Sequence, residues 1–194
     1  DNGNFVPTDG NTVTFTDVPP SNPFFDFVET LSRDDISQGC GGGKFCPDDG
    51  VTRAQMAVFL LKSKYGSGYN PPPATGGVFS DVHPGDFAAA WIEELAAQGI
   101  TAGCASGKYC PNQIVSRAQM AVFLLRTKHG SSYVPPAPTG VFGDLDPNDP
   151  FTPWIEELAA EGITSGCGGG NYCPNDPSSR EQMAAFLVKT FALP

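Results

Sequence analysis

The sequence predicts a mainly α-helical protein made of three copies of one helix-loop-helix unit. A Gly-Cys pair is followed six residues later by Cys-Pro at three places in the 194-residue chain, and each time a Ser or Thr followed by Arg-x-Gln-Met then opens an apolar run. The first cysteines of the copies, Cys40, Cys104 and Cys167, lie 64 and 63 residues apart, so the pattern is an internal repeat. Because a unit of this size barely buries enough surface to fold alone, we expect the three units to pack together as one body.

Polar and proline-rich segments separate the copies. We assign an N-terminal arm to residues 1–14 and the repeats to 15–66, 78–130 and 141–194. The connecting segments, strap 1 (67–77) and strap 2 (131–140), each carry a tyrosine, a proline cluster and Thr-Gly. Since the connections are themselves repeated, we predict that they are semi-rigid and pack on the body.

Each repeat begins with a short extended segment that leads into a first helix. In repeat 2 this segment is residues 78–84, where Asp81 is placed to hydrogen-bond local backbone. Residues 87–98 then carry apolar side chains at helical spacing, and Gly99 follows where a left-handed C-terminal cap belongs. Repeat 3 matches this pattern. Repeat 1 has Asp35 in place of the glycine, and Asp tolerates the left-handed conformation better than most residues.

A glycine-rich loop joins the two helices of each repeat, and the cysteines flank it. Six cysteines allow 15 pairings, but the repeat favours local disulfides, which indicate an oxidising compartment. The expected pairs are Cys40–Cys46, Cys104–Cys110 and Cys167–Cys173. Zinc is disfavoured because each repeat offers only two thiolates, and His83 and His129 recur in no other repeat. The loops also lack the Gly-Lys-Ser/Thr sequence by which a P-loop binds nucleotide phosphates.

The second helix of each repeat opens with a capping box, in which a hydroxyl residue and a glutamine three residues later bond each other's backbone N–H. The expected N-caps are Thr52, Ser116 and Ser179. Within each helix, Met, Phe and Leu fall at i, i+3 and i+4, which makes the methionines part of an apolar core stripe. Basic residues gather at the far end, as the helix dipole favours.

An arginine occupies the first position of each second helix: Arg53, Arg117 and Arg180. The positive end of the helix dipole disfavours a cation there by about 0.3 to 1 kcal/mol, so a compensating role is expected. In one interpretation, the arginine forms a salt bridge or carbonyl contacts with a neighbouring repeat. In the other, the guanidinium and free helix N–H groups together bind a carboxylate or phosphate.

Composition excludes several classes of function. The net charge of -10, with 11 basic against 21 acidic residues, argues against nucleic-acid binding. No stretch of eighteen or more apolar residues is present to span a membrane. The chain begins at Asp1 without a signal segment, which suggests a mature secreted product or an artificially chosen start. With the disulfides, this predicts a location outside the cytoplasm.

Five short motifs recur in a fixed order. In repeat 2 they are Phe79-x-Asp81-Val82, Trp91-Ile92-x-x-Leu95, Gly99-Ile100-x-x-Gly103, Tyr109-x-Pro111 and Ser116-Arg117-Ala118-Gln119. Together they resemble the S-layer homology (SLH) module, and the resemblance runs from about Phe15 to Leu193. It implies a pseudo-threefold spindle, secreted or at a bacterial cell surface, whose grooves bind cell-envelope polysaccharide or a peptidoglycan-linked polymer. The ligand-binding residues that it implies are Arg53, Arg117, Arg180, Trp91, Trp154 and Phe27.

The chain departs from the family pattern in two ways. The glutamate of the family's Thr-Arg-Ala-Glu motif is Gln55, Gln119 and Gln182, which keeps the capping box but removes a charge near the implied grooves. The cysteines stand where the family has an aromatic residue after the glycine and a residue before the proline. A disulfide therefore replaces local packing.

Two functions are expected from these observations. The first is a non-catalytic anchor that binds envelope glycan through the grooves. The alternative is a self-assembling subunit of a surface layer, tube or filament, which the straps and the arm would suit. No enzyme, cofactor or metal is expected, because Glu93-Glu94 and Glu156-Glu157 read as solvated helix faces and no catalytic set recurs. The acidic stretch 144–149 could supply calcium ligands, but a turn is favoured because the other repeats are less acidic there.

Overall fold

The computed structural model describes residues 13–194, so most of the expected N-terminal arm lies outside the described residues. The described residues form six helices, two per repeat. The first helices are α1 (Phe25–Arg33), α3 (Ala89–Ala97) and α5 (Thr152–Ala160), and the second helices are α2 (Arg53–Tyr65), α4 (Arg117–His129) and α6 (Arg180–Phe191). In this range extended segments pair only through isolated β-bridges, which confirms the mainly α prediction. No helix in this part of the chain is long and apolar enough to cross a membrane.

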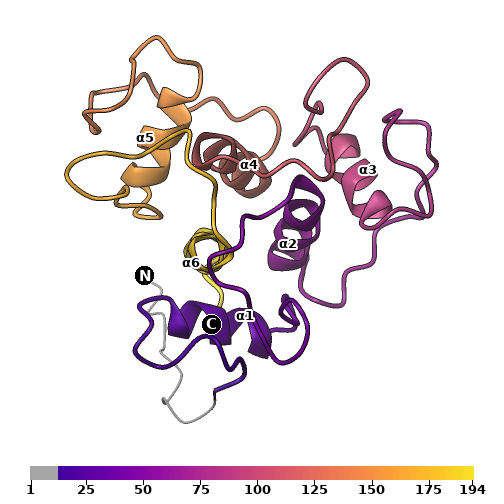
Figure 1. The fold of residues 1–194 in the computed structure, drawn as a ribbon. Coiled ribbons are helices and arrows are strands. Elements are labelled where there is room, and N and C mark those ends of the chain that lie inside the picture. The colour runs from indigo at the N-terminus through magenta and orange to yellow at the C-terminus, as the bar shows by residue number, and fades with distance from the viewer. Residues whose placement is uncertain (1–12) are drawn as a thin grey trace.

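The three second helices form the centre of the molecule, and the first helices lie around them (Figure 1). Helices α2, α4 and α6 contact one another in all three pairs. Each first helix packs on the second helix of the preceding repeat: α3 on α2, α5 on α4, and α1 on α6. Because α1 packs on the last helix of the chain, the order of contacts closes on itself.

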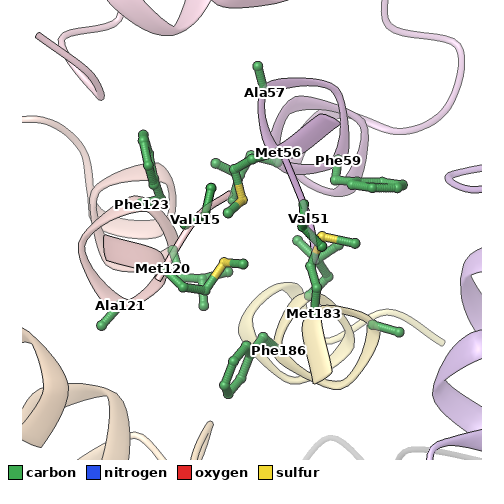
Figure 2. Packing of buried hydrophobic residues seen from close by; sticks show 14 of the residues in the cluster. Val51, Met56, Ala57, Phe59, Val115, Met120, Ala121, Phe123, Met183 and Phe186 are labelled. Carbon is green, nitrogen blue, oxygen red and sulfur yellow. The ribbon is translucent and has the colours of Figure 1, made fainter. Parts of the chain in front are cut away.

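The centre is joined by three equivalent backbone hydrogen bonds. The N–H of Val51 donates to the carbonyl of Ser178 at 3.0 Å, that of Ser178 to Val115 at 2.9 Å, and that of Val115 to Val51 at 2.9 Å. Beside this ring lie the fully buried methionines Met56, Met120 and Met183, whose side chains lie between the three helices in Figure 2. The methionines are therefore core residues, as predicted.

The helix caps follow the sequence closely. Thr52 and Ser116 form complete capping boxes with Gln55 and Gln119. Ser179 accepts from the N–H of Gln182, but the return bond that completes the box is not formed. The Oε1 of Gln182 instead accepts from Nη1 of Arg117, a residue of another repeat, at 3.3 Å.

The first helices end as predicted but differ at their start. Gly99 and Gly162 have φ of 69° and 72°, and Asp35 adopts the same left-handed conformation with φ of 55°. Helix α3 begins at Ala89, because Ala88 has φ of 62° and is itself left-handed. The expected start at residue 87 is therefore wrong by two residues, and the side chain of Phe87 is 69% exposed.

An aspartate of each leading segment holds the distant end of the cysteine loop. Oδ1 and Oδ2 of Asp81 accept from the N–H of Tyr109 and of Cys110, both at 2.8 Å, and Asp17 and Asp144 do the same in their repeats. These two donors lie 28 and 29 residues along the chain, and the backbone of the aspartate itself supplies a further, local hydrogen bond that lowers its pKa. Desolvation raises the pKa of these carboxyl groups, but the hydrogen bonds from the backbone N–H groups lower it by more. The net pKa therefore lies below the ordinary value.

The three local disulfides are present as predicted. They join Cys40 to Cys46, Cys104 to Cys110 and Cys167 to Cys173. The second cysteine of each pair has a left-handed backbone with φ between 58° and 60°. Since a non-glycine residue is disfavoured in this conformation, the disulfide and the aspartate together stabilise the loop.

Glutamates of the first helices fasten the segments that precede each repeat. Glu156 accepts from the N–H groups of Thr139 and Gly140 in strap 2 and from that of Val141, the residue that follows the strap. Glu93 accepts from the N–H groups of Thr75 and Gly76 in strap 1. Glu29 accepts from Thr14 at the same place in repeat 1. The interpretation of the acidic pairs as solvated faces is therefore wrong, because Glu156 and Glu157 both bind strap 2 and Glu93 binds strap 1. The straps pack on the body as predicted.

Candidate inter-repeat binding sites

The arginine that opens each second helix reaches into the next repeat. Nε donates to a backbone carbonyl at 2.7 to 2.8 Å, and the guanidinium lies over the aromatic ring of that same residue, with 4.6 to 4.8 Å from Cζ to the ring centre. The pairs are Arg53 with Tyr109, Arg117 with Tyr172, and Arg180 with Phe45. The third pair returns to repeat 1, so these contacts also form a closed cycle.

Two of the aromatic partners return a hydrogen bond. The hydroxyl of Tyr109 donates to the carbonyl of Arg53 at 2.8 Å, and that of Tyr172 donates to Arg117 at 2.9 Å. Burial raises the pKa of both tyrosines well above the ordinary value, although the adjacent arginine lowers it, so both hydroxyls remain donors. Phe45 has no hydroxyl, and the contact with Arg180 is therefore the weakest of the three in hydrogen bonding.

The helix N-termini are not available to an anion. The N–H of Arg53 donates to the carbonyl of Gln113, and that of Ala54 donates to Pro111, both at 2.9 Å. The corresponding groups of α4 and α6 are bonded to neighbouring repeats in the same way. The interpretation that free helix N–H groups bind the ligand is therefore wrong, whereas the predicted carbonyl contacts to a neighbouring repeat are confirmed.

One nitrogen of each arginine nevertheless remains unpaired. The three arginines are only 3 to 4% exposed, and Nη2 of each is buried with no hydrogen-bond partner. Burial lowers the pKa of Arg53 and Arg180 from the ordinary value, while nearby groups act in the opposite direction. An arginine stays protonated in proteins, and a buried charged donor without a partner costs several kcal/mol. Each Nη2 therefore has an unmet demand for an acceptor.

A pocket of about 420 Å³ opens beside Arg53. All three repeats contribute to it: Arg53 comes from repeat 1, Gln119 and Arg126 from repeat 2, and Phe151 from repeat 3. An equivalent pocket of about 140 Å³ opens beside Arg117, where Gln182 and Lys189 come from repeat 3 and Phe24 from repeat 1. Neither lining contains an Asp or Glu, although the chain has a net charge of -10.

The first-helix aromatics Trp91, Trp154 and Phe27 are predicted ligand-binding residues, but they lie outside the two pockets. Trp91 and Trp154 form T-shaped ring pairs with the strap tyrosines Tyr69 and Tyr133, at 6.0 and 6.2 Å between ring centres. Neither tryptophan lines the pocket beside Arg53 or Arg117, and Phe27 does not line them either.

Sequence reasoning missed two aromatic residues, Phe24 and Phe151, that line the pockets. Each lies three residues before the first-helix aromatic, and this spacing was the available signal.

The acidic stretch at 144–149 forms turns, as favoured from the sequence. Asp146 accepts from the N–H of Asn148, Asp149 accepts from that of Phe151, and both oxygens of Asp144 are bonded to backbone. No group of three or more metal-ligating side chains occurs among residues 13–194. These carboxylates stabilise backbone rather than gather around one point.

The repeat and its contacts correspond to a known family. A sequence profile of the S-layer homology domain matches residues 14–57, 78–121 and 141–184. The chain belongs to the S-layer homology domain family. The matched ranges include Arg53, Arg117 and Arg180 and all six cysteines. They include none of the strap residues 67–77 and 131–140.

Several larger proteins contain related SLH sequence. A cell surface protein of Thermoanaerobacter kivui is 33% identical over 116 residues, which is 59% of this chain and 15% of that protein. Cell surface glycoprotein 1 of Acetivibrio thermocellus is 27% identical over 89% of this chain and 8% of its own length. Endo-1,4-beta-xylanase A of Thermoanaerobacterium saccharolyticum is 32% identical over 88% of this chain and 14% of its own length. The chain thus spans less than a sixth of each of these relatives.

Proposed function

We propose that this protein is a non-catalytic cell-surface module that attaches to envelope polysaccharide through sites between its repeats. The SLH match supports an anchoring role, and two of the relatives are cell surface proteins. The related xylanase shares only 14% of its length with this chain, so its activity is not transferred. The closed cycle of contacts between repeats supports a pseudo-threefold spindle with one such site at each arginine.

A single observation carries the choice of site: the buried, unpaired Nη2 of Arg53, Arg117 and Arg180. Because Nη2 is covered in the unliganded protein, the proposal requires the residues that cover it to shift when the ligand binds. A ligand oxygen at this nitrogen would then satisfy a charged donor that the protein leaves without an acceptor. Because neither described pocket has an acidic residue in its lining, we propose that the polysaccharide carries carboxylate or phosphate groups. Phe151 and Phe24 supply an apolar wall for a sugar ring in these pockets.

The test replaces all three arginines by lysine. A lysine retains one cation that reaches the backbone carbonyl, but it has no second nitrogen for the ligand. Cosedimentation with purified bacterial envelope sacculi should show affinity reduced about tenfold or more, since a hydrogen bond to a charged group contributes about 1.5 to 3 kcal/mol. Arg33→Lys makes the same change at a side chain that is 43% exposed and serves as the control. Equal binding by the triple variant and the parent would reject the arginine sites.

No contact or comparison supports the self-assembling subunit. It stays a prediction from the sequence, and the anchor is the function that we propose.

A further inference from the structure

Each of the two described pockets contains a second cation. Arg126 lines the pocket beside Arg53, and Lys189 lines the pocket beside Arg117. The two cations occupy equivalent places, because each lies nine residues after the arginine that opens its own helix. The sequence pattern had assigned them only to the helix dipole.

Both second cations lie over an aromatic ring of a first helix. Cζ of Arg126 is 5.3 Å from the ring centre of Trp154, and Nζ of Lys189 is 5.9 Å from that of Phe27. These distances are within the range of cation–π attraction. Nε of Arg126 is also buried without a hydrogen-bond partner. The pocket beside Arg53 is thus lined by two arginines, each of which has a buried nitrogen without a hydrogen-bond partner.

The ring of Trp154 is itself held in place by strap 2. The rings of Tyr133 and Trp154 form a T-shaped pair with 6.2 Å between their centres. The hydroxyl of Tyr133 donates to Glu157 at 2.6 Å, and its ring stacks on that of His129 with 4.4 Å between ring centres. His129 in turn bonds Glu161 at 2.5 Å. A ring fixed on one side by these contacts presents a defined surface to Arg126.

We propose that Arg126 and Lys189 are ligand-binding residues, and that Trp154 and Phe27 are positioning residues that hold these cations toward the pockets. This rests on the proposed function and deepens it: each site binds an acidic group of the polymer with two cations contributed by different repeats. The first-helix aromatic acts through the cation and does not stack on the sugar. This role explains why neither Trp154 nor Phe27 lines a pocket.

The experiment is a double-mutant cycle on the full chain, with affinity for purified envelope sacculi as the first readout and thermal unfolding as the second. Arg126→Gln should weaken binding about tenfold or more. Trp154→Leu should weaken it about 3- to 30-fold, and Trp154→Phe should retain most of the affinity because it keeps a ring. In the Arg126→Gln background, Trp154→Leu should cause no further loss. Lys128→Gln is the matched control, since it removes one positive charge two residues from Arg126 at a side chain outside the pocket lining.

The outcomes separate this inference from the proposed function. If Trp154→Leu weakens binding equally with and without Arg126, the ring contacts the ligand directly and the positioning role is rejected. If Arg126→Gln binds like the parent while the triple arginine-to-lysine variant does not, the second cation is rejected and the proposed function stands. If neither set changes binding, the arginine sites of the proposed function are rejected together with this inference. Should Trp154→Leu not fold, the cycle of Lys189→Gln with Phe27→Leu decides the same question in the other pocket.

Discussion

Ser178 is the one polar member of the backbone ring at the centre of the molecule. Its equivalents are Val51 and Val115, and all three side chains are fully buried. The hydroxyl of Ser178 has no hydrogen-bond partner, and a buried unsatisfied group costs about 1 to 3 kcal/mol. Valine would remove that hydroxyl and add apolar volume worth about 0.8 kcal/mol per methylene, with part of the gain lost to tighter packing. We therefore expect Ser178→Val to raise the free energy of unfolding by about 1 to 2 kcal/mol.

Urea unfolding with the disulfides intact measures this change, which corresponds to about 2 to 8 °C in Tm. Ser178→Ala should recover only the part due to the hydroxyl. The reverse substitution, Val115→Ser, should lower the free energy of unfolding by about 2 to 4 kcal/mol, because it buries a second unpaired hydroxyl and removes apolar contact. A loss of stability in Ser178→Val, with Val115→Ser tolerated, would refute the account of the centre as an apolar ring of equivalent positions.

Three further predictions concern the features that hold each repeat. Reduction of the disulfides should lower the free energy of unfolding by about 2 kcal/mol per bridge, since each closes a short loop, and chemical unfolding with and without reductant measures it. Asp17, Asp81 and Asp144 have lowered folded-state pKa values, so their stabilisation is complete above the unfolded pKa near 4 and is lost as pH falls through the folded pKa. Replacing all three by Asn should therefore flatten the dependence of stability on pH below about 4; an unchanged acid transition would contradict this. Glu156→Gln should release strap 2, so that the amides of Thr139 to Val141 exchange faster in hydrogen-exchange measurements while those of α4 do not.

The local structure could be predicted from the sequence because its causes are local. The capping residues, the left-handed position of Asp35 and the disulfide pairs all depend on side chains within a few positions of the backbone that they stabilise. The repeat supplied three independent instances of each pattern. The exception, the incomplete box at Ser179, arose because Gln182 bonds Arg117 from another repeat.

The contacts between repeats could not be predicted in the same way. Arg53 bonds a carbonyl 56 residues along the chain, and Arg180 bonds one 135 residues back. The sequence indicated that the arginines needed a partner, since their place at a helix N-terminus is unfavourable. It did not indicate which repeat supplied that partner. Arg126 likewise matched the helix-dipole pattern, and only the fold brought it to a pocket and to Trp154.

The central claim is that the unpaired Nη2 nitrogens bind acidic groups of the envelope polymer. The most direct measurement is a crystal structure of the full chain with an acidic oligosaccharide fragment released from purified envelope sacculi. The account predicts a carboxylate or phosphate oxygen within about 3 Å of Nη2 of Arg53, the usual distance for such a charged hydrogen bond. A fragment bound elsewhere, with Nη2 still lacking an acceptor, would contradict it.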